Sequence, residues 1–190
     1  MDAIAPFKDT ALEALRPRLA ALEPRARALV VGIRPEARRT PPPTGGWSVD
    51  DCLEHLCRTH DLYLGRRLPA VIATARHRPA PHRPFAPSLA GRLMLAALRE
   101  GNRIRLPAPG RLRVRERDTV REQVLDAFVA SVERLASQMR EADGLDLRVS
   151  FRSPISPLVH LRLGEAFAIL IEHAHRHLAQ AERARAAIGA

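Results

Sequence analysis

Hydrophobic residues recur at helical spacing along the chain, and the first such stretch covers residues 11–33. Leucines and alanines there follow each other at intervals of three to four positions, which predicts an amphipathic helix. Pro17 and Pro24 interrupt the pattern. Because proline removes a backbone donor and its ring clashes with the preceding turn, we expect either a kinked helix or two short helices.

A second helix is predicted after residues 40–46, a run of proline, threonine and glycine that breaks regular structure. Ser48 is a favourable N-cap, and Asp50 and Asp51 fall in the first turn, where carboxylates meet the positive end of the helix dipole. We expect this helix to run to about Ala75.

A third long helix is predicted to begin at Thr119. Glu122 follows three positions later, and this pair has the spacing of a capping box. We expect the helix to end near Asp143 and Gly144. Its apolar stripe consists of Val120, Val124, Ala127, Phe128, Val132, Leu135 and Met139.

The last helix is predicted to begin at Leu161 or Leu163 and to run to about Ile188, and a shorter helix covers residues 89–98. We find no convincing set of strands and no internal repeat. Four main amphipathic helices and a short one, joined by long crossover loops, define an all-α protein, and we predict a four-helix bundle. At 190 residues we expect a single domain, residues 1–190, that buries roughly 70% of the surface of the unfolded chain.

Composition narrows the class of protein. Two cysteines exclude a disulfide-rich scaffold. The longest stretch without a charged residue, 40–49, is far shorter than the ~18 apolar residues of a membrane span. The N-terminus lacks a basic start followed by an apolar run, so we predict no secretory signal and a cytoplasmic protein without membrane contact.

The formal net charge of +10 would ordinarily suggest an anionic partner such as nucleic acid. Arginines are spread along the chain, however, and only Lys8 is a lysine, which indicates a compositional habit. The densest basic stretch covers residues 99–121. Arginine alternates there with Leu112 and Val114, which most simply predicts a solvated edge or hairpin arm after a turn at 107–110. A contact with an anion is the alternative. No zinc finger, aromatic RNP pair or basic heptad region accompanies it, so an arginine-rich nucleic-acid binder on the bundle scaffold is only a third, less favoured interpretation.

Three histidines on the last predicted helix hold the clearest chemistry. His173 and His177 lie about 40° apart around the helix axis, one turn above the other, so their imidazoles can share one metal ion. They border the apolar stripe, whereas His175 points roughly away from both and is expected among the exposed charges. Pairs at this spacing also occur where histidines only pack or form hydrogen bonds, so that alternative stays open at this point.

Two segments together resemble the DinB-like superfamily. Residues 47–55 carry a Trp-Ser helix start with a histidine eight positions after the tryptophan, and residues 173–180 carry His-x-x-x-His followed by Leu and Gln. This superfamily, named for a damage-inducible protein, includes bacillithiol transferases and mycothiol-dependent maleylpyruvate isomerases. The resemblance covers nearly the whole chain in helix order and implies a four-helix bundle in which three histidines hold a divalent metal. They correspond here to His55, His173 and His177.

Three neutral imidazoles leave at least one coordination position of a metal open, as in catalytic rather than structural sites. That position takes water, a thiolate or a substrate oxygen. Zinc is the default for imidazole ligands, and nickel, iron or manganese are alternatives for the same set.

The apolar stripe of the second helix leaves a second interpretation of the third ligand open. His60 falls inside this stripe and His55 on the other side, so His60 is an alternative ligand, a core histidine or a group beside the ligands, although the family spacing selects His55. Cys52 and Cys57 lie on different faces and are expected in the core, with approach of Cys52 to the metal as a lesser alternative. Trp47 is expected to anchor its loop to the helix.

Other enzyme templates are missing from the sequence. It has no glycine-rich phosphate loop, no Gly-x-Ser-x-Gly elbow and no His-Glu-x-x-His motif. Glu54 and Glu172 neighbour candidate ligands in the sequence but point elsewhere, so we expect both in salt bridges. No catalytic side chain is identified, and the chemistry has to rest on the metal.

The resemblance implies a thiol S-transferase that uses a low-molecular-weight thiol, or a small-molecule hydrolase or isomerase. The alternative is a non-catalytic bundle that binds a metal or ligand in a stress response. The excess of arginine favours an anionic co-substrate, and Arg58 and Arg176 lie within a turn of candidate ligands. Helix faces rich in alanine and leucine, together with the resemblance, lead us to expect a homodimer.

Overall fold

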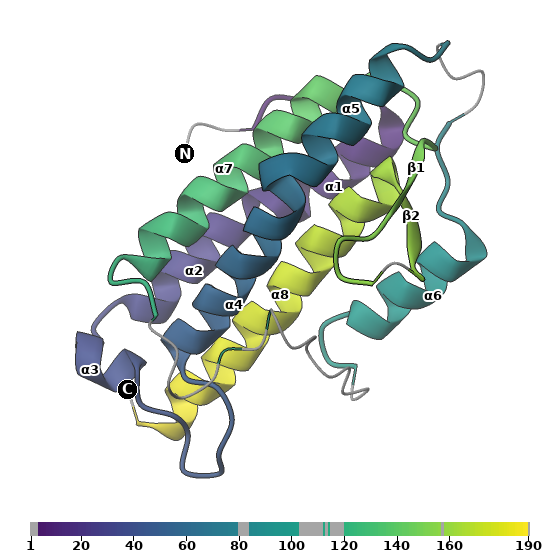
Figure 1. The fold of residues 1–190 in the computed structure, drawn as a ribbon. Coiled ribbons are helices and arrows are strands. Elements are labelled where there is room, and N and C mark those ends of the chain that lie inside the picture. The colour runs from purple at the N-terminus through teal and green to yellow at the C-terminus, as the bar shows by residue number, and fades with distance from the viewer. Residues whose placement is uncertain are drawn as a thin grey trace.

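Helices make up most of the molecule (Figure 1). The computed structural model describes residues 4–79, 84–102, 112, 114, 120–156 and 158–189. The predicted all-α class is confirmed. In chain order the elements are α1 (Thr10–Ala20), α2 (Leu22–Val30), α3 (Pro35–Arg38), α4 (Val49–Leu62), the π-helical turn η1 (Tyr63–Arg67), α5 (Leu68–Arg76), α6 (Leu89–Leu98), α7 (Val124–Ala142), β1 (Ser150–Arg152), β2 (His160–Arg162) and α8 (Leu163–Ala187).

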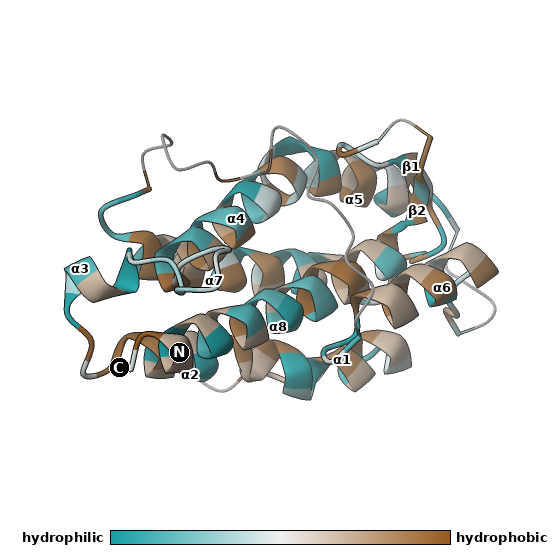
Figure 2. Ribbon diagram, turned by 90° about the horizontal axis from the view of Figure 1, so that it is seen from below, coloured by the Kyte–Doolittle hydropathy of each residue, from teal (hydrophilic) through white to brown (hydrophobic). Residues whose placement is uncertain are grey.

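Four helical segments lie side by side and form the body of the protein (Figure 1). They are α1 with α2, α4 with η1 and α5, α7, and α8. α4 packs against both α7 and α8, and α1 and α2 also pack against both of them. Phe128 of α7 and Phe167 of α8 are fully buried among these segments. In Figure 2, α6 lies outside this group, where it packs against α8.

The first predicted helix is divided into two helices. Pro17 lies within α1, which ends at Ala20, and α2 begins at Leu22. Asp9 caps α1, since its carboxylate accepts hydrogen bonds from two backbone N–H groups of the first turn. The predicted interruption of this segment is therefore confirmed.

The second predicted helix begins and ends where the sequence indicates. The Ser48 hydroxyl accepts a hydrogen bond from the N–H of Asp51 (3.1 Å), and the Asp51 carboxylate accepts one from the N–H of Ser48 (3.0 Å). The helix then passes through η1, where the N–H of Leu68 bonds to the carbonyl of Tyr63, and ends at Arg76. Such wider turns inside a helix are rare.

The predicted start of α7 is wrong, because residues 120–123 are not helical, and the predicted start of α8 is confirmed. α7 begins at Val124, after Gln123, which makes no side-chain cap. Glu122 lies in the turn before it, and Thr119 is outside the described residues. α8 begins at Leu163, one of the two predicted starts, and ends at Ala187.

The prediction of no strands is wrong for residues 150–162. Strands β1 and β2 pair antiparallel, with Phe151 opposite Leu161. Each strand has only three residues, which is too short to produce a recognisable alternation of polar and apolar positions. The pair precedes α8 directly and brings the chain back toward it.

The basic stretch between α6 and α7 is described only in part. Leu112 and Val114 are buried, with 4% and 5% of their surface exposed. The predicted turn at 107–110 lies outside the described residues, as do the arginines that alternate with these two side chains, Arg111, Arg113, Arg115 and Arg117.

α6 is held closely against α8. The buried Glu165 carboxylate accepts hydrogen bonds from the N–H groups of Arg162 (2.9 Å) and Ser88 (2.6 Å). A Cβ atom at Gly91 would lie 2.5 Å from Glu165 Oε1, so only glycine permits this approach. In the described part of the chain, no helix has the length and apolar character needed to cross a membrane.

Candidate metal centre

Three histidines meet where α4 packs against α8. His55 comes from α4, and His173 and His177 come from successive turns of α8. Their candidate ligand atoms all lie within 4.8 Å of one another. His55 Nε2 and His173 Nε2 are 3.2 Å apart. The structure therefore brings together the three side chains that the resemblance selected.

His55 is oriented by a backbone carbonyl. Only 2% of its surface is exposed, and its Nδ1 lies 2.8 Å from the carbonyl oxygen of Leu112. Because a carbonyl can only accept, Nδ1 carries the proton and donates it to this oxygen. Nε2, which faces His173, then has a free lone pair. The buried Leu112 thus has a role beside the cluster that the sequence did not indicate.

His177 is oriented by a side chain on its own helix. Its Nδ1 lies 3.0 Å from Oε1 of Gln180, three residues later. An amide oxygen accepts, so the His177 proton is on Nδ1 and Nε2 is available as a ligand. Such hydrogen bonds from the second ring nitrogen to an oxygen are characteristic of metal-binding histidines.

The donor spacing fits a divalent metal. Zinc–nitrogen bonds of about 2.05 Å at a tetrahedral angle separate two ligand nitrogens by about 3.3 Å. The observed distance between His55 Nε2 and His173 Nε2 is 3.2 Å. His173 Nδ1 is buried and has no hydrogen-bond partner among the described residues. One pair of donors therefore already has the spacing of zinc ligands, and all three candidate ligand atoms lie within 4.8 Å of one another.

All three imidazoles are uncharged near pH 7. Burial and, to a smaller extent, the charge of His55 lower the pKa of His177 to about 3. Burial also lowers the pKa of His173 well below its ordinary value. For His55 the same effect is partly opposed by the hydrogen bond to Leu112. Because a metal binds the neutral imidazole, little proton competition is expected at this pH.

Trp47 lies against the cluster. Its ring centroid is 4.8 Å from that of His55 and 5.6 Å from that of His177. It is partly buried and packs against the core, as expected of an anchor for its loop. The sequence did not indicate that the same ring also covers two of the three histidines.

His60 lies apart from the three-histidine group. Its side chain is fully buried, and its ring stacks on Phe128 with centroids 5.8 Å apart. Its Nδ1 lies 2.6 Å from the hydroxyl oxygen of Ser131 on α7. Of the alternatives left open by the sequence, the structure places His60 in the core rather than in the cluster.

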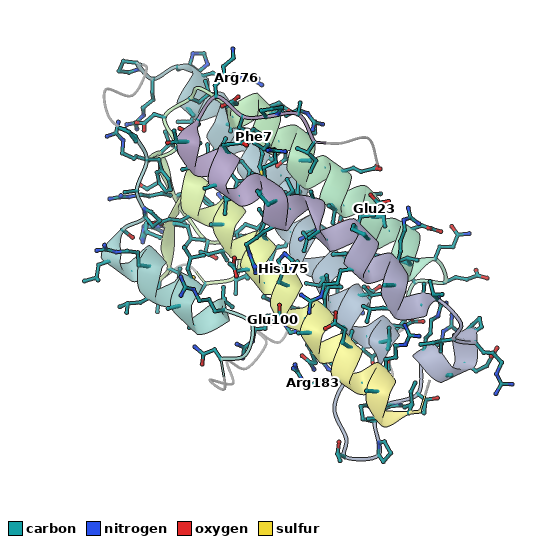
Figure 3. All side chains as sticks on the ribbon, turned by 180° about the vertical axis from the view of Figure 1, so that it is seen from behind. Phe7, Glu23, Arg76, Glu100, His175 and Arg183 are labelled. Carbon is teal, nitrogen blue, oxygen red and sulfur yellow. The ribbon has the colours of Figure 1, made fainter. Side chains whose placement is uncertain are left out.

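The prediction that His175 is exposed is wrong. Only 4% of its surface is exposed, since α1 and α2 pack on that side of α8 (Figure 3). Its Nε2 donates to the carbonyl of Arg18 (2.9 Å), and its Nδ1 lies 3.1 Å from the guanidinium of Arg25. The helical wheel separated it correctly from His173 and His177, but it could not show that other helices cover its face.

The two cysteines are buried, as predicted. Both thiols are free, and Cys57 Sγ lies 3.7 Å from the carbonyl of Val124. Burial raises the pKa of Cys57 to about 12 and raises that of Cys52 still further. Neither side chain can supply a thiolate at neutral pH.

Four charged groups near the histidines form ion pairs, and a fifth contacts backbone carbonyls. Glu54 pairs with Arg58 (2.9 Å) and Glu172 with Arg18 (2.6 Å), so the predicted salt bridges are confirmed. Arg176 donates to two backbone carbonyls in and after α6. Arg183, which the sequence analysis did not single out, is exposed on α8, and its charge lowers the pKa of His177.

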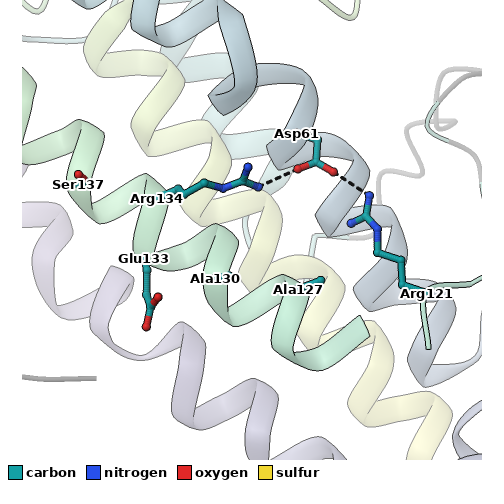
Figure 4. Close-up of a pocket in the computed structure, with 7 residues that line it drawn as sticks. All are labelled: Asp61, Arg121, Ala127, Ala130, Glu133, Arg134 and Ser137. Atoms are coloured by element: carbon teal, nitrogen blue, oxygen red, sulfur yellow. Dashed lines mark hydrogen bonds and ion pairs between the residues drawn. The ribbon is translucent and has the colours of Figure 1, made fainter. Parts of the chain in front are cut away.

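A separate groove of about 620 Å³ lies between α4 and α7 (Figure 4). Asp61 lies at its edge, and its two carboxylate oxygens pair with Arg121 and Arg134, each at 2.7 Å. None of the three clustered histidines lines the groove. The candidate chemistry and this groove are therefore at different places.

The fold and the cluster define a class of mostly helical proteins with a three-histidine group suited to a divalent metal. The family model of the DinB superfamily matches residues 18–181, a range that includes all three histidines, so the chain belongs to the DinB superfamily. No curated protein and no solved structure gives a significant match to the chain.

Proposed function

We propose that this protein is a metal-dependent enzyme in which His55, His173 and His177 hold one divalent ion. The observation that carries the proposal is three neutral imidazoles whose ligand atoms lie within 4.8 Å of one another. Zinc is the first choice for such a ligand set, with nickel, iron or manganese as alternatives.

The reacting group in this proposal comes from outside the chain. Three protein ligands leave a position open, and a metal held there lowers the pKa of a thiol or of water that occupies it. The carbonyl of Leu112 and the amide of Gln180 hold two of the imidazoles with Nε2 toward that position. Because burial raises the pKa of both cysteines, neither supplies a thiolate. We therefore propose transfer of a low-molecular-weight thiol as the reaction, with hydrolysis or isomerisation of a small substrate as the alternative chemistry.

Charge around the cluster favours an anionic thiol. Arg58, Arg176 and Arg183 all lower the pKa of one or more of the clustered histidines, so the local potential is positive. Guanidinium groups bind carboxylates well, and low-molecular-weight thiols often carry carboxylates. Arg58 and Arg176 already have partners, so Arg183 is the residue to which we assign recognition of that carboxylate.

The test uses cobalt-substituted protein and two small thiols that differ in one charge. 2-Mercaptoethanol and 3-mercaptopropionate should both change the cobalt absorption, and the charged thiol should do so at several-fold lower concentration. Arg183→Gln is expected to remove this preference, whereas Arg92→Gln, an equal charge change on α6, is expected to retain it. Consumption of an epoxide or a maleyl compound in the presence of thiol measures transfer. If cobalt binds but no thiol changes its spectrum and no electrophile is consumed, the transferase proposal is wrong.

A second function is a non-catalytic protein that binds a metal or a small ligand in a stress response. One observation favours it. Glu54 directly precedes His55 and Glu172 directly precedes His173, and both carboxylates form ion pairs with arginines. Neither is then free to act as a general base. Metal binding without turnover in the experiment above would support this function.

A further inference from the structure

Two of the clustered imidazoles donate their ring N–H to an uncharged oxygen. His55 Nδ1 lies 2.8 Å from the backbone carbonyl oxygen of Leu112, and His177 Nδ1 lies 3.0 Å from the amide oxygen of Gln180. Each acceptor holds a proton on Nδ1 and leaves Nε2 as the ligand atom. A carboxylate at position 180 would select the same tautomer, so the tautomer alone does not require an amide there.

The orientation of the His177 ring does not depend on Gln180 alone. The ring centroid of His177 lies 4.5 Å from those of His55 and His173 and 5.6 Å from that of Trp47. Close-packed neighbours leave a ring little freedom to rotate. The acceptor at Nδ1 therefore acts mainly on the position of the proton and on the electron density of the imidazole.

Two carboxylates lie directly before clustered histidines in the sequence, but their ion pairs are with arginines. Glu54 pairs with Arg58 (2.9 Å), and Glu172 pairs with Arg18 (2.6 Å). The acceptors that the fold brings to the two imidazoles are instead a backbone carbonyl and a side-chain amide. Neither of these acceptors carries a charge.

The charge of such an acceptor changes how strongly an imidazole donates to a metal. An acceptor on the second ring nitrogen raises the basicity of the ligand nitrogen. A carboxylate does so more than an amide, because hydrogen bonds to a charged acceptor are stronger. Three neutral imidazoles, two of them with neutral acceptors, bring no negative charge to a divalent ion. Its two positive charges then favour an anion at the open position.

We propose that Gln180 is a positioning residue that keeps the metal centre electron-poor, because its amide fixes the proton on His177 Nδ1 without adding negative charge. The class of ligand that this charge selects at the open position is a small anion. The inference rests on the proposed three-histidine metal site. It deepens the proposed function, because a thiolate is the small anion that a thiol transferase uses.

The experiment compares two substitutions at position 180 that keep the length of the side chain. Gln180→Glu replaces the amide with a charged acceptor, and Gln180→Met removes the acceptor. Zinc affinity, measured at pH 7 by competition with a chromophoric chelator, should rise about tenfold in Gln180→Glu and fall about 10- to 100-fold in Gln180→Met. A merely structural role of Gln180 would lower the affinity in both variants.

Anion binding provides a second readout, which a structural role would not move. Azide is titrated into cobalt-loaded protein and followed by the cobalt absorption. Gln180→Glu should bind azide about tenfold more weakly than wild type, although it holds the metal more tightly, because the added negative charge lies close to the anion. Gln123→Glu is the matched control, since it makes the same change at an exposed position before α7. It should leave the zinc and azide affinities within about twofold of wild type, because solvent and salt screen an exposed charge.

Melting of the metal-free variants verifies that they fold. Gln180 is only partly buried and glutamate has the same shape, so Gln180→Glu should melt as wild type does.

The outcomes separate this inference from the proposed function. If wild type binds zinc and Gln180→Glu binds both zinc and azide no differently, the metal site stands and the role of Gln180 is wrong. Weaker zinc binding in Gln180→Glu would also overturn that role. If wild type and His173→Ala bind zinc equally, the three-histidine site itself is wrong, and the role of Gln180 falls with it.

Discussion

Hydrogen bonds at the ring nitrogens separate the buried histidines by role. In His55 and His177 the Nδ1 atom donates to an oxygen of the chain, and Nε2 is left for the cluster. In His175 both nitrogens are engaged, one by the carbonyl of Arg18 and the other by the guanidinium of Arg25. A neutral imidazole with both nitrogens occupied has no lone pair for a metal. Its hydrogen bonds, and not only its place on the helix, exclude His175 as a ligand.

Alanine at His55, His173 or His177 is expected to reduce bound metal sharply, because each change removes one of three ligands. Alanine at His175 should leave the metal content unchanged and lower the melting temperature, since it removes two hydrogen bonds of a buried side chain. Elemental analysis of the purified variants measures the first effect.

Melting curves with and without added zinc provide the control for these variants. Zinc should raise the melting temperature of wild type and of His175→Ala, but not that of His173→Ala, because an ion that binds only the folded chain stabilises it. Equal loss of metal from the His175 and His173 variants would contradict the assignment.

The free energy of unfolding of the metal-free protein is expected to fall as the pH drops below about 6.5. Burial lowers the pKa of His60 to about 4, Arg134 adds to the lowering and Asp61 opposes it. Between these pH values the unfolded chain takes up a proton at this residue and the folded chain does not. The stability present above pH 6.5 is therefore lost progressively toward pH 4.

Urea denaturation of the metal-free protein at pH 7 and pH 5 measures this effect. In His60→Leu the difference in unfolding free energy between the two pH values should be smaller than in wild type. A difference of unchanged size would show that His60 does not contribute to the pH dependence.

At the scale of elements, α6 depends on close contacts with the start of α8. Glu165 joins the two helices, because its carboxylate accepts hydrogen bonds from the backbone N–H of Ser88, before α6, and of Arg162, before α8. Gly91 leaves room for that carboxylate, and Gly164 leaves room for the ring of Phe85. A short, mostly apolar helix is thereby held in one position on the outside of the protein.

Gly91→Ala is expected to destabilise the protein by about 1–3 kcal/mol, because the added Cβ would overlap the buried Glu165 carboxylate. Gly65→Ala is the matched control. A Cβ at Gly65 meets no atom within 4 Å, and alanine is the better helix former, so this change should be neutral or stabilising by up to about 1 kcal/mol. Chemical denaturation of the two variants measures the difference, and equal stabilities would contradict the packing argument.

For the whole molecule, the sequence predicts the long helices well and the contacts between them poorly. The capping residues around Ser48 are local, so the start of α4 could be predicted from a few positions. The i,i+4 spacing of His173 and His177 is local too. The approach of His55 depends on packing between helices distant in the sequence, and only the family resemblance pointed to it. The burial of His175 and the contact of Leu112 with His55 also depend on distant segments, so no periodicity could indicate them.

The predicted homodimer remains a prediction, and α6 is the surface where we would look for it. Most of α6 is coloured hydrophobic in Figure 2, and its Leu89 and Leu93 are exposed by 67% and 64%. Burying such a face against a second copy would be favourable. Light scattering over a range of concentrations should give the mass of a dimer for wild type and of a monomer for Leu93→Glu. A monomer at every wild-type concentration would show that the prediction is wrong.

The position of Trp47 allows its fluorescence to report metal binding at the cluster. It is the single tryptophan of the chain, and its indole ring lies 4.8 Å from His55 and 5.6 Å from His177. Open-shell ions such as cobalt or nickel quench indole emission at short range, whereas closed-shell zinc does not. Occupancy of the cluster, and displacement of one ion by another, should therefore be readable from intrinsic fluorescence without any label.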